Sequence, residues 1–167
     1  MKKLSALFIV ALIVFASCAK KESKCPFTES DIVAPASEQE ALKDSLSAKG
    51  IEATMDPSGF FYKINNEGTG SKATSLCSTV AVYYRGGFLN GNGFDSTSGN
   101  PAVFQLGQVI PGWQKALPLI ATSGKITLYI PPSLAYGSKE VKDPATGRVI
   151  IPANSNLVFD VALVDVQ

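Results

Sequence analysis

The chain has 167 residues, of which 15 are basic and 14 acidic, so its formal net charge at pH 7 is +1. This balance lacks the excess of positive charge that nucleic-acid binding normally requires, and we expect no nucleic-acid partner. The sequence contains no histidine. Ser-His-Asp and Cys-His nucleophilic machinery and most catalytic zinc sites are therefore excluded, and we expect neither a metal nor another cofactor.

Residues 1–17 have the pattern of a bacterial lipoprotein signal peptide. Two lysines precede an apolar stretch at 4–16, which is shorter than the roughly 20 residues of a membrane-spanning helix. Cys18 then completes a lipobox-like Phe-Ala-Ser-Cys sequence, although Phe15 replaces the usual aliphatic residue. We expect lipidation of Cys18 and a lipid anchor in the bacterial cell envelope, on the periplasmic side of a membrane or at the cell surface. The alternative is ordinary signal cleavage near residues 16–19.

Two further cysteines, Cys25 and Cys77, are separated by a long stretch of chain. Export would bring them into an oxidising environment, so we expect a disulfide between them that ties the N-terminal extension to the main domain. It would close a loop of about 50 residues and stabilise the fold by roughly 4 kcal/mol in the chain-entropy treatment. The alternative is a pair of free buried thiols.

The segment after the signal is predicted to be a tether at 18–36 and a helical extension at 37–59. Apolar residues recur at helical spacing within 38–49, which predicts a helix there. Ser37 and Glu40 have the spacing of a capping box, and Gly50 can end the helix in a left-handed conformation. We expect this helix to pack on the main domain or on a second copy of the chain.

The main domain, 60–167, is dominated by predicted strands and turns. Apolar residues alternate or cluster between residues typical of turns, which predicts strands at 60–65, 79–86, 102–106, 125–130 and 156–166. Helical signal is confined here to a short piece after Pro111. We therefore predict an α+β fold, an antiparallel sheet with one face wrapped around a short helix.

The single tryptophan, Trp113, lies in the first turn of that short helix. Pro111 suits the first helical position, and Pro118 limits the helix to about two turns. Trp113 can be ordinary core filler or part of a ligand pocket. Other aromatic residues at strand and loop ends, Tyr84, Phe94 and Tyr136, favour a lined pocket, because binding sites concentrate in such places.

The sequence resembles the FKBP-type peptidyl-prolyl isomerases over about 60–167. Five ordered motifs carry the resemblance: VYYRG at 82–86, NGFDS at 92–96, FQLGQVIPGWQKAL at 104–117, PPSLAYG at 131–137 and IIPANSNLVFDVALV at 150–164. The resemblance implies a strongly bent antiparallel sheet around a short helix. It also implies catalysis of rotation about X-Pro bonds in exported polypeptides, with no cofactor.

The resemblance further assigns roles to individual residues. It implies that Trp113 floors a proline pocket, that Asp95 is the acidic residue beside it and that the Tyr136 hydroxyl binds a substrate carbonyl. It also implies walls and a far rim, formed by Tyr84, Phe94, Val109, Ile110 and Phe159 and by the backbone at Ile150 or Ile151.

The same residues leave simpler interpretations open. Phe159 and Val109 can be pure core, and Asp95 can make only a turn bond or a local charge contact. Ala102 stands where many relatives have an aromatic wall, so we expect reduced affinity for macrolide inhibitors. The long, charged loop at 138–149 departs from the family pattern, and we expect it to affect the substrate preference. A non-catalytic chaperone module that binds proline-containing peptides and a purely structural lipoprotein are the alternative functions.

Overall fold

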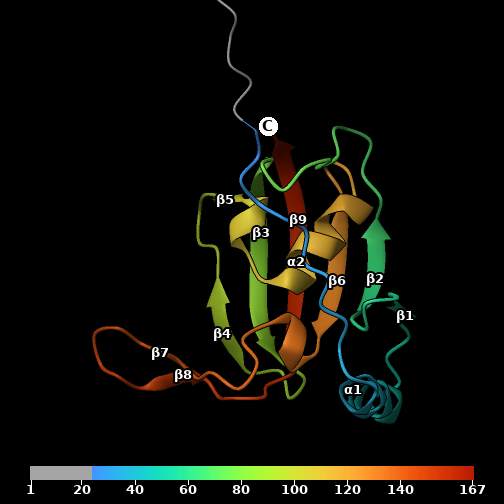
Figure 1. Cartoon of the computed structure of the whole chain (residues 1–167), viewed down its shortest axis with the longest axis vertical. Helices are drawn as coiled ribbons and strands as arrows, with labels where there is room; N and C mark the ends of the chain where they lie inside the picture. Colours follow the sequence, from blue (N-terminus) through green and yellow to red (C-terminus); the bar gives the residue numbers. More distant parts are fainter. Residues whose placement is uncertain (1–23) are drawn as a thin grey trace, which may run out of the picture.

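The structure is a computed structural model that describes residues 24–167 (Figure 1). The predicted signal peptide and Cys18 lie outside the described residues. Within 24–167, no helix has the combination of length and hydropathy needed to cross a membrane.

One antiparallel sheet holds most of the described strands. Its main path runs β1 (Thr54–Met55), β2 (Phe61–Asn66), β6 (Lys125–Ile130), β9 (Leu157–Val166), β3 (Thr79–Phe88) and β4 (Gly93–Ser96), and β5 (Ala102–Gln105) pairs with β3. The central strand β9 pairs with both β3 and β6. The alternation in the sequence therefore predicts the long strands, and the predicted α+β fold is confirmed.

The short helix α2 (Pro111–Ala116) covers the inner face of this sheet (Figure 1). Alternate residues of β9 point toward it, and Leu157, Phe159, Val161 and Leu163 are all buried in one cluster with Trp113. A Cβ on Gly112 would lie 2.7 Å from Cγ2 of Ile130, so this glycine lets the helix approach β6 closely. This close contact therefore sets the distance between α2 and the sheet.

The N-terminal helix α1 (Ala36–Ala48) begins two residues before the predicted start, and the predicted capping box is wrong. Ser37 lies inside the helix, and no side chain caps its first turn. The chain turns earlier because the N–H of buried Ala34 donates to the carbonyl of Ser58 at 2.8 Å. This tertiary contact outweighs the capping-box pattern in the local sequence. Gly50 follows the helix with a φ of 64°, as predicted.

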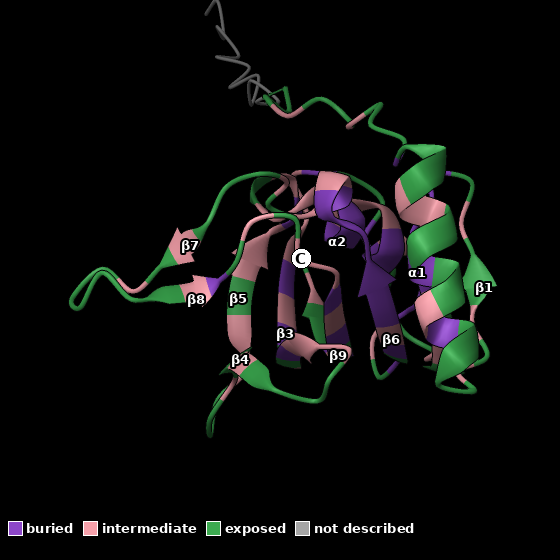
Figure 2. Ribbon diagram, turned by 90° about the horizontal axis from the view of Figure 1, so that it is seen from below, coloured by how far each residue is buried: buried purple, intermediate pink, exposed green. Residues whose placement is uncertain are grey.

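Helix α1 packs on the sheet of the same chain (Figure 2). Leu42 and Leu46 are buried against Phe61 of β2 and Tyr129 of β6. Burial of each leucine stabilises the fold by about 1.5–3 kcal/mol. This contact confirms the first of the two expected roles, packing on the main domain.

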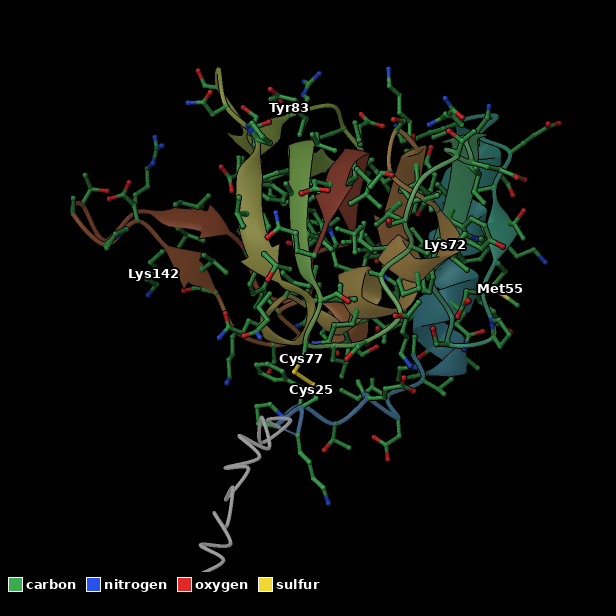
Figure 3. All side chains as sticks on the ribbon, turned by 90° about the horizontal axis from the view of Figure 1, so that it is seen from above. Cys25, Met55, Lys72, Cys77, Tyr83 and Lys142 are labelled. Carbon is green, nitrogen blue, oxygen red and sulfur yellow. A yellow bond between two sulfur atoms is a disulfide. The ribbon has the colours of Figure 1, made fainter. Side chains whose placement is uncertain are left out.

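Residues 24–35, here called the N-terminal strap, run over the domain toward α1 (Figure 1). The strap is attached at Cys25, which forms a disulfide with Cys77 (Figure 3). It is attached again where the ammonium group of Lys115 donates to the carbonyl of Ser30 at 2.6 Å. The described part of the predicted tether therefore lies along the domain.

The charged loop at 138–149 and the two residues after it form a two-stranded arm, with strands β7 (Val141–Lys142) and β8 (Val149–Ile151). The arm projects from the side of the molecule opposite α1 (Figure 2). Its turn is organised by Asp143, whose carboxylate accepts hydrogen bonds from the N–H groups of Ala145 and Thr146 at 2.9 and 2.8 Å. Bonds from Thr146 and Ala145 lower the pKa of Asp143.

Candidate functional site

Most of the predicted site residues meet around one cavity of about 290 Å³ between the sheet and α2. The strands contribute aromatic and acidic side chains, the segment before α2 contributes aliphatic ones, and Tyr136 comes from the loop after β6. The lining residues are Tyr84, Phe94, Asp95, Phe104, Gln108, Val109, Ile110, Trp113, Tyr136 and Phe159. Residues from five separate motifs thus share one pocket.

Trp113 is the central ring of this pocket, and only 4% of it is exposed. The rings of Tyr84, Phe104 and Phe159 stand edge-on to it, with centroids 5.4, 5.9 and 5.3 Å away. Edge-to-face packing at these distances is favourable because the ring edges are positive and the faces negative. Three neighbours therefore fix the orientation of the indole.

Phe94 extends this cluster toward β4. Its ring lies 5.7 Å from that of Phe159 at an interplanar angle of 83°. Both rings pack over Gly86, where a Cβ would lie 2.7 Å from Cε2 of Phe94 and 2.8 Å from Cε1 of Phe159. The glycine of the VYYRG motif therefore makes room for two aromatic walls.

A hydrogen-bonded acid and phenol form the polar side of the pocket. The Tyr84 hydroxyl donates to Oδ2 of Asp95 at 2.5 Å. Burial first, and the bond to Asp95 second, raise the pKa of Tyr84 well above its ordinary value of 10.0. Asp95 thus makes a specific contact across two strands and orients one wall of the pocket.

Tyr136 lies at the exposed margin, with 40% of its surface accessible. Burial of its hydroxyl first, and the charge of Asp95 second, raise its pKa above 10.0. The phenol therefore keeps its proton at neutral pH and can donate a hydrogen bond to a bound molecule.

Two predicted residues, Ile150 and Ile151, do not line the cavity. Ile151 pairs with Val141 at the base of the arm, and its side chain is buried in the main core. Ile150 is partly buried against the same core. The pairing with Val141 therefore places Ile151 at the base of the arm and not in the wall of the pocket.

Phe104 and Gln108 line the cavity but were not among the predicted wall residues. The alternation in 102–106 offered a signal for Phe104, because β5 places Ala102 and Phe104 opposite Val82 and Val80, both buried. Ala102 itself does not line the cavity. No periodic pattern in the sequence distinguishes Gln108, which lies in a short 3-10 turn, Leu106–Gln108.

A larger cavity of about 750 Å³ lies between the N-terminal strap and the domain. Its walls include Val33, Leu76, Gln114 and Lys115, and no aromatic residue lines it. It therefore lacks the packed rings and the phenol–carboxylate pair. We place the candidate site in the smaller, aromatic cavity.

The sheet, the short helix and the aromatic pocket between them define the FKBP class of protein. The family model described as FKBP-type peptidyl-prolyl cis-trans isomerase matches residues 70–164. The chain belongs to this family.

Relatives with known names support the same assignment. The probable FKBP-type peptidyl-prolyl cis-trans isomerase of Haemophilus influenzae is 39% identical over 161 residues, which cover 95% of this chain and 61% of the relative. The outer membrane protein MIP of Legionella longbeachae is 42% identical over 128 residues, which cover 75% of this chain and 51% of the relative. The chain thus spans only about half to three-fifths of the length of these relatives.

A crystal structure of FkpA from Escherichia coli has the same fold over most of the described chain. The TM-score is 0.63 at 40% sequence identity, and the match covers 79% of this chain and 58% of that one. The strongly bent sheet around a short helix is therefore shared with a solved FKBP-type structure.

Proposed function

We propose that the chain is a peptidyl-prolyl cis-trans isomerase that acts on X-Pro bonds of exported polypeptides. One observation carries the proposal, the cavity in which Trp113 is surrounded by the edges of Tyr84, Phe104 and Phe159. Such a pocket has an apolar floor and closely packed aromatic walls, and these properties suit the apolar ring of proline. In the domain plan that we propose, 60–167 is the isomerase domain and 37–59 is a helical extension.

Rotation about an X-Pro bond needs no nucleophile and no proton acceptor. The obstacle is amide resonance, which sets a barrier of about 18–20 kcal/mol for rotation about a peptide bond. A twisted amide has lost conjugation, and its oxygen is less negative and less dependent on water. A dry aromatic pocket therefore binds the twisted state better than the planar state, which lowers the barrier. This chemistry is compatible with a chain that has no histidine.

Trp113 would form the floor under the proline ring, and Phe94, Val109, Ile110 and Phe159 would form walls. Tyr136 would donate a hydrogen bond from its protonated phenol to a substrate carbonyl beside the rotating bond. Asp95 would act on the wall through Tyr84, whose hydroxyl it binds. Ile150 or Ile151 would contribute only by backbone contact, because neither side chain lines the cavity.

We further propose that the protein is a lipoprotein of the cell envelope, anchored through Cys18. The lipobox-like sequence before Cys18 supports this location, as does the disulfide between Cys25 and Cys77, because disulfides persist mainly in oxidising compartments. A relative is named outer membrane protein MIP. The anchor can be tested by growing cells with a labelled fatty acid. If Cys18 is lipidated, the parent chain should carry the label and Cys18→Ala should carry none.

Macrolide inhibitors that mimic a proline residue would compete for the same cavity. The expected loss of macrolide affinity rested on Ala102, which does not line the pocket. Phe104 supplies an aromatic wall from the same strand. We therefore propose that Ala102 does not itself reduce the affinity for such inhibitors.

The test of function is the cis-to-trans rate of a short Leu-Pro peptide with the parent chain, Tyr136→Phe and Tyr83→Phe. The control removes a phenol hydroxyl that bonds the carbonyl of Gly99 outside the pocket. We expect kcat/KM to fall about tenfold in Tyr136→Phe, the loss of one hydrogen bond made in the transition state, and to stay unchanged in Tyr83→Phe. A folded parent chain that binds the peptide without accelerating exchange would instead be the non-catalytic binding module.

A further inference from the structure

The aromatic ring of Phe27, in the N-terminal strap, packs on the backbone of Gly107. The three atoms nearest to the place where a Cβ on Gly107 would lie are all ring carbons of Phe27. Phe27 is half-buried and belongs to the margin of the main core cluster. The strap thus supplies the side-chain packing that Gly107 itself lacks.

The position of Phe27 is fixed by the neighbouring disulfide. Cys25, two residues before Phe27, is bonded to Cys77, with the Cα atoms 5.7 Å apart (Figure 3). The residues on either side of Cys77 bind the same turn that Phe27 covers. The carbonyl of Leu76 accepts from the N–H of Gly107 at 2.7 Å, and the carbonyl of Ser78 accepts from the N–H of Leu106 at 2.9 Å.

The turn held in this way continues directly into the pocket. Gln108, Val109 and Ile110 follow Gly107 and form one side of the cavity. From the other side, the Gln114 side-chain amide donates to the carbonyls of Gly107 and Val109 at 3.3 and 2.8 Å. The segment 106–110 therefore lies between two supports, Gln114 from α2 and Phe27 from the strap.

We propose that Phe27 is a positioning residue for this site. Held by the Cys25–Cys77 disulfide, it fixes segment 106–110 and so sets the width of the pocket into which the proline ring enters. The inference rests on the proposed function. It means that the pocket depends on a residue of the strap as well as on the domain 60–167. Phe27 does not line the pocket, so it acts only through Gly107 and the residues that follow.

The test compares the full chain with Phe27→Ala, Phe27→Leu and the control Ile32→Ala. Ile32 lies on the same strap and is 41% exposed. We expect KM for a Leu-Pro peptide to rise about fivefold in Phe27→Ala, within the loss that a misplacement of about 1 Å can cause. The value of kcat should change little, Phe27→Leu should recover part of the loss, and Ile32→Ala should match the parent.

Two further arms address the disulfide and Gly107. Dithiothreitol converts the Cys25–Cys77 bond into two thiols while its own two thiols form a ring disulfide, and this reduction should raise KM of the parent but not of Phe27→Ala. The single variant Gly107→Ala should displace the Phe27 ring and raise KM. Adding Gly107→Ala to Phe27→Ala should cause little further change in KM.

Amide hydrogen exchange gives a readout that does not require catalysis. In Phe27→Ala, the N–H groups of Leu106 and Gly107 should exchange about tenfold faster, while that of Val161 in β9 should be unchanged. Unchanged exchange at both amides overturns the inference. Faster exchange with an unchanged KM in an active chain also overturns it, because the turn would then be held without affecting the pocket.

If the parent chain is inactive, the proposed function fails and the inference is judged separately. The Kd of the Leu-Pro peptide, measured by the fluorescence of Trp113, then replaces KM. A weaker Kd together with faster exchange supports the positioning role of Phe27. An unchanged Kd, or no binding to the parent chain at all, overturns it.

Discussion

The hydroxyl of Tyr84, on β3, donates a hydrogen bond of 2.5 Å to Oδ2 of Asp95, on β4. The bond crosses between two strands and joins a wall of the aromatic pocket to its only lining carboxylate. The ring of Tyr84 also stands edge-on to Trp113, with centroids 5.4 Å apart. The Asp95 carboxylate therefore helps to orient Tyr84, whose ring packs against Trp113 in the pocket.

Asp95→Asn should lower the pKa of Tyr84 only partly toward its ordinary value. Burial is the larger cause of the raised pKa and survives the change, whereas the bond to the carboxylate and its charge are lost. The pKa of Tyr136 should fall as well, because Asp95 contributes to it. The pKa values can be measured by titrating the phenolate absorbance of Asp95→Asn and of the double variant Asp95→Asn/Tyr84→Phe. The difference between the two titrations belongs to Tyr84, because the double variant lacks its phenol. Identical titrations in the parent and Asp95→Asn would contradict the coupling.

The raised tyrosine pKa values predict a loss of stability in alkali. Burial first and nearby carboxylates second raise the pKa values of Tyr84, Tyr129 and Tyr136 above 10.0. The folded chain keeps these protons where the unfolded chain loses them, so their contribution is complete below about pH 10 and declines above it. Urea unfolding between about pH 8 and 11 measures this decline. Tyr84→Phe should make it shallower, and an unchanged slope would exclude Tyr84 as a source.

Gly86→Ala should reduce isomerase activity by disturbing two pocket walls. The new methyl group would lie 2.7 Å from Phe94 and 2.8 Å from Phe159, so both rings must shift, and overpacking of this kind costs about 1–3 kcal/mol. Gly93→Ala is the matched control on β4, because its nearest neighbour would be at 3.7 Å. We expect kcat/KM to fall about tenfold in Gly86→Ala, the equivalent of about 1.4 kcal/mol. Equal activity of the two variants would contradict the packing argument.

Leu42→Ala should destabilise the chain without altering the pocket. Leu42 of α1 is fully buried in a cluster with Phe61 and Tyr129, away from the aromatic site. The free energy of unfolding should fall by about 2–5 kcal/mol, as for other buried leucines. The kcat/KM of the folded fraction should equal that of the parent. A specific loss of activity would instead mean that the helical extension acts on the site.

Ser37→Ala tests the corrected start of the same helix. The serine side chain caps nothing, so the free energy of unfolding should change by no more than about 0.5 kcal/mol. A true N-cap would lose about 1 kcal/mol or more. Thermal unfolding of the variant separates these values.

Local pattern and motif predicted most of the fold and much of the candidate site. Strands such as β6 and β9 follow from alternation, since a period of two places Leu157 and Phe159 on the same face. The resemblance to the family indicated Tyr84, Phe94 and Trp113, which line one cavity in the structure. Motif order and residue type were sufficient for these positions.

Tertiary contacts between distant segments could not be predicted in the same way. The start of α1 depends on Ala34 binding Ser58, and the packing of Gly107 depends on Phe27, 80 residues earlier in the chain. Neither pair has a periodic or compositional signal. The orientation of Ile151 likewise depends on its pairing with Val141 in the arm.

The most direct test of the central claim is the cis-to-trans exchange rate of a Leu-Pro peptide with and without the full chain. We expect an acceleration that falls strongly in Trp113→Ala, in a variant shown to be folded by its circular dichroism. We also expect a macrolide that mimics proline to compete with the peptide and to lower the acceleration. A folded parent chain that leaves the exchange rate at its uncatalysed value would contradict the claim.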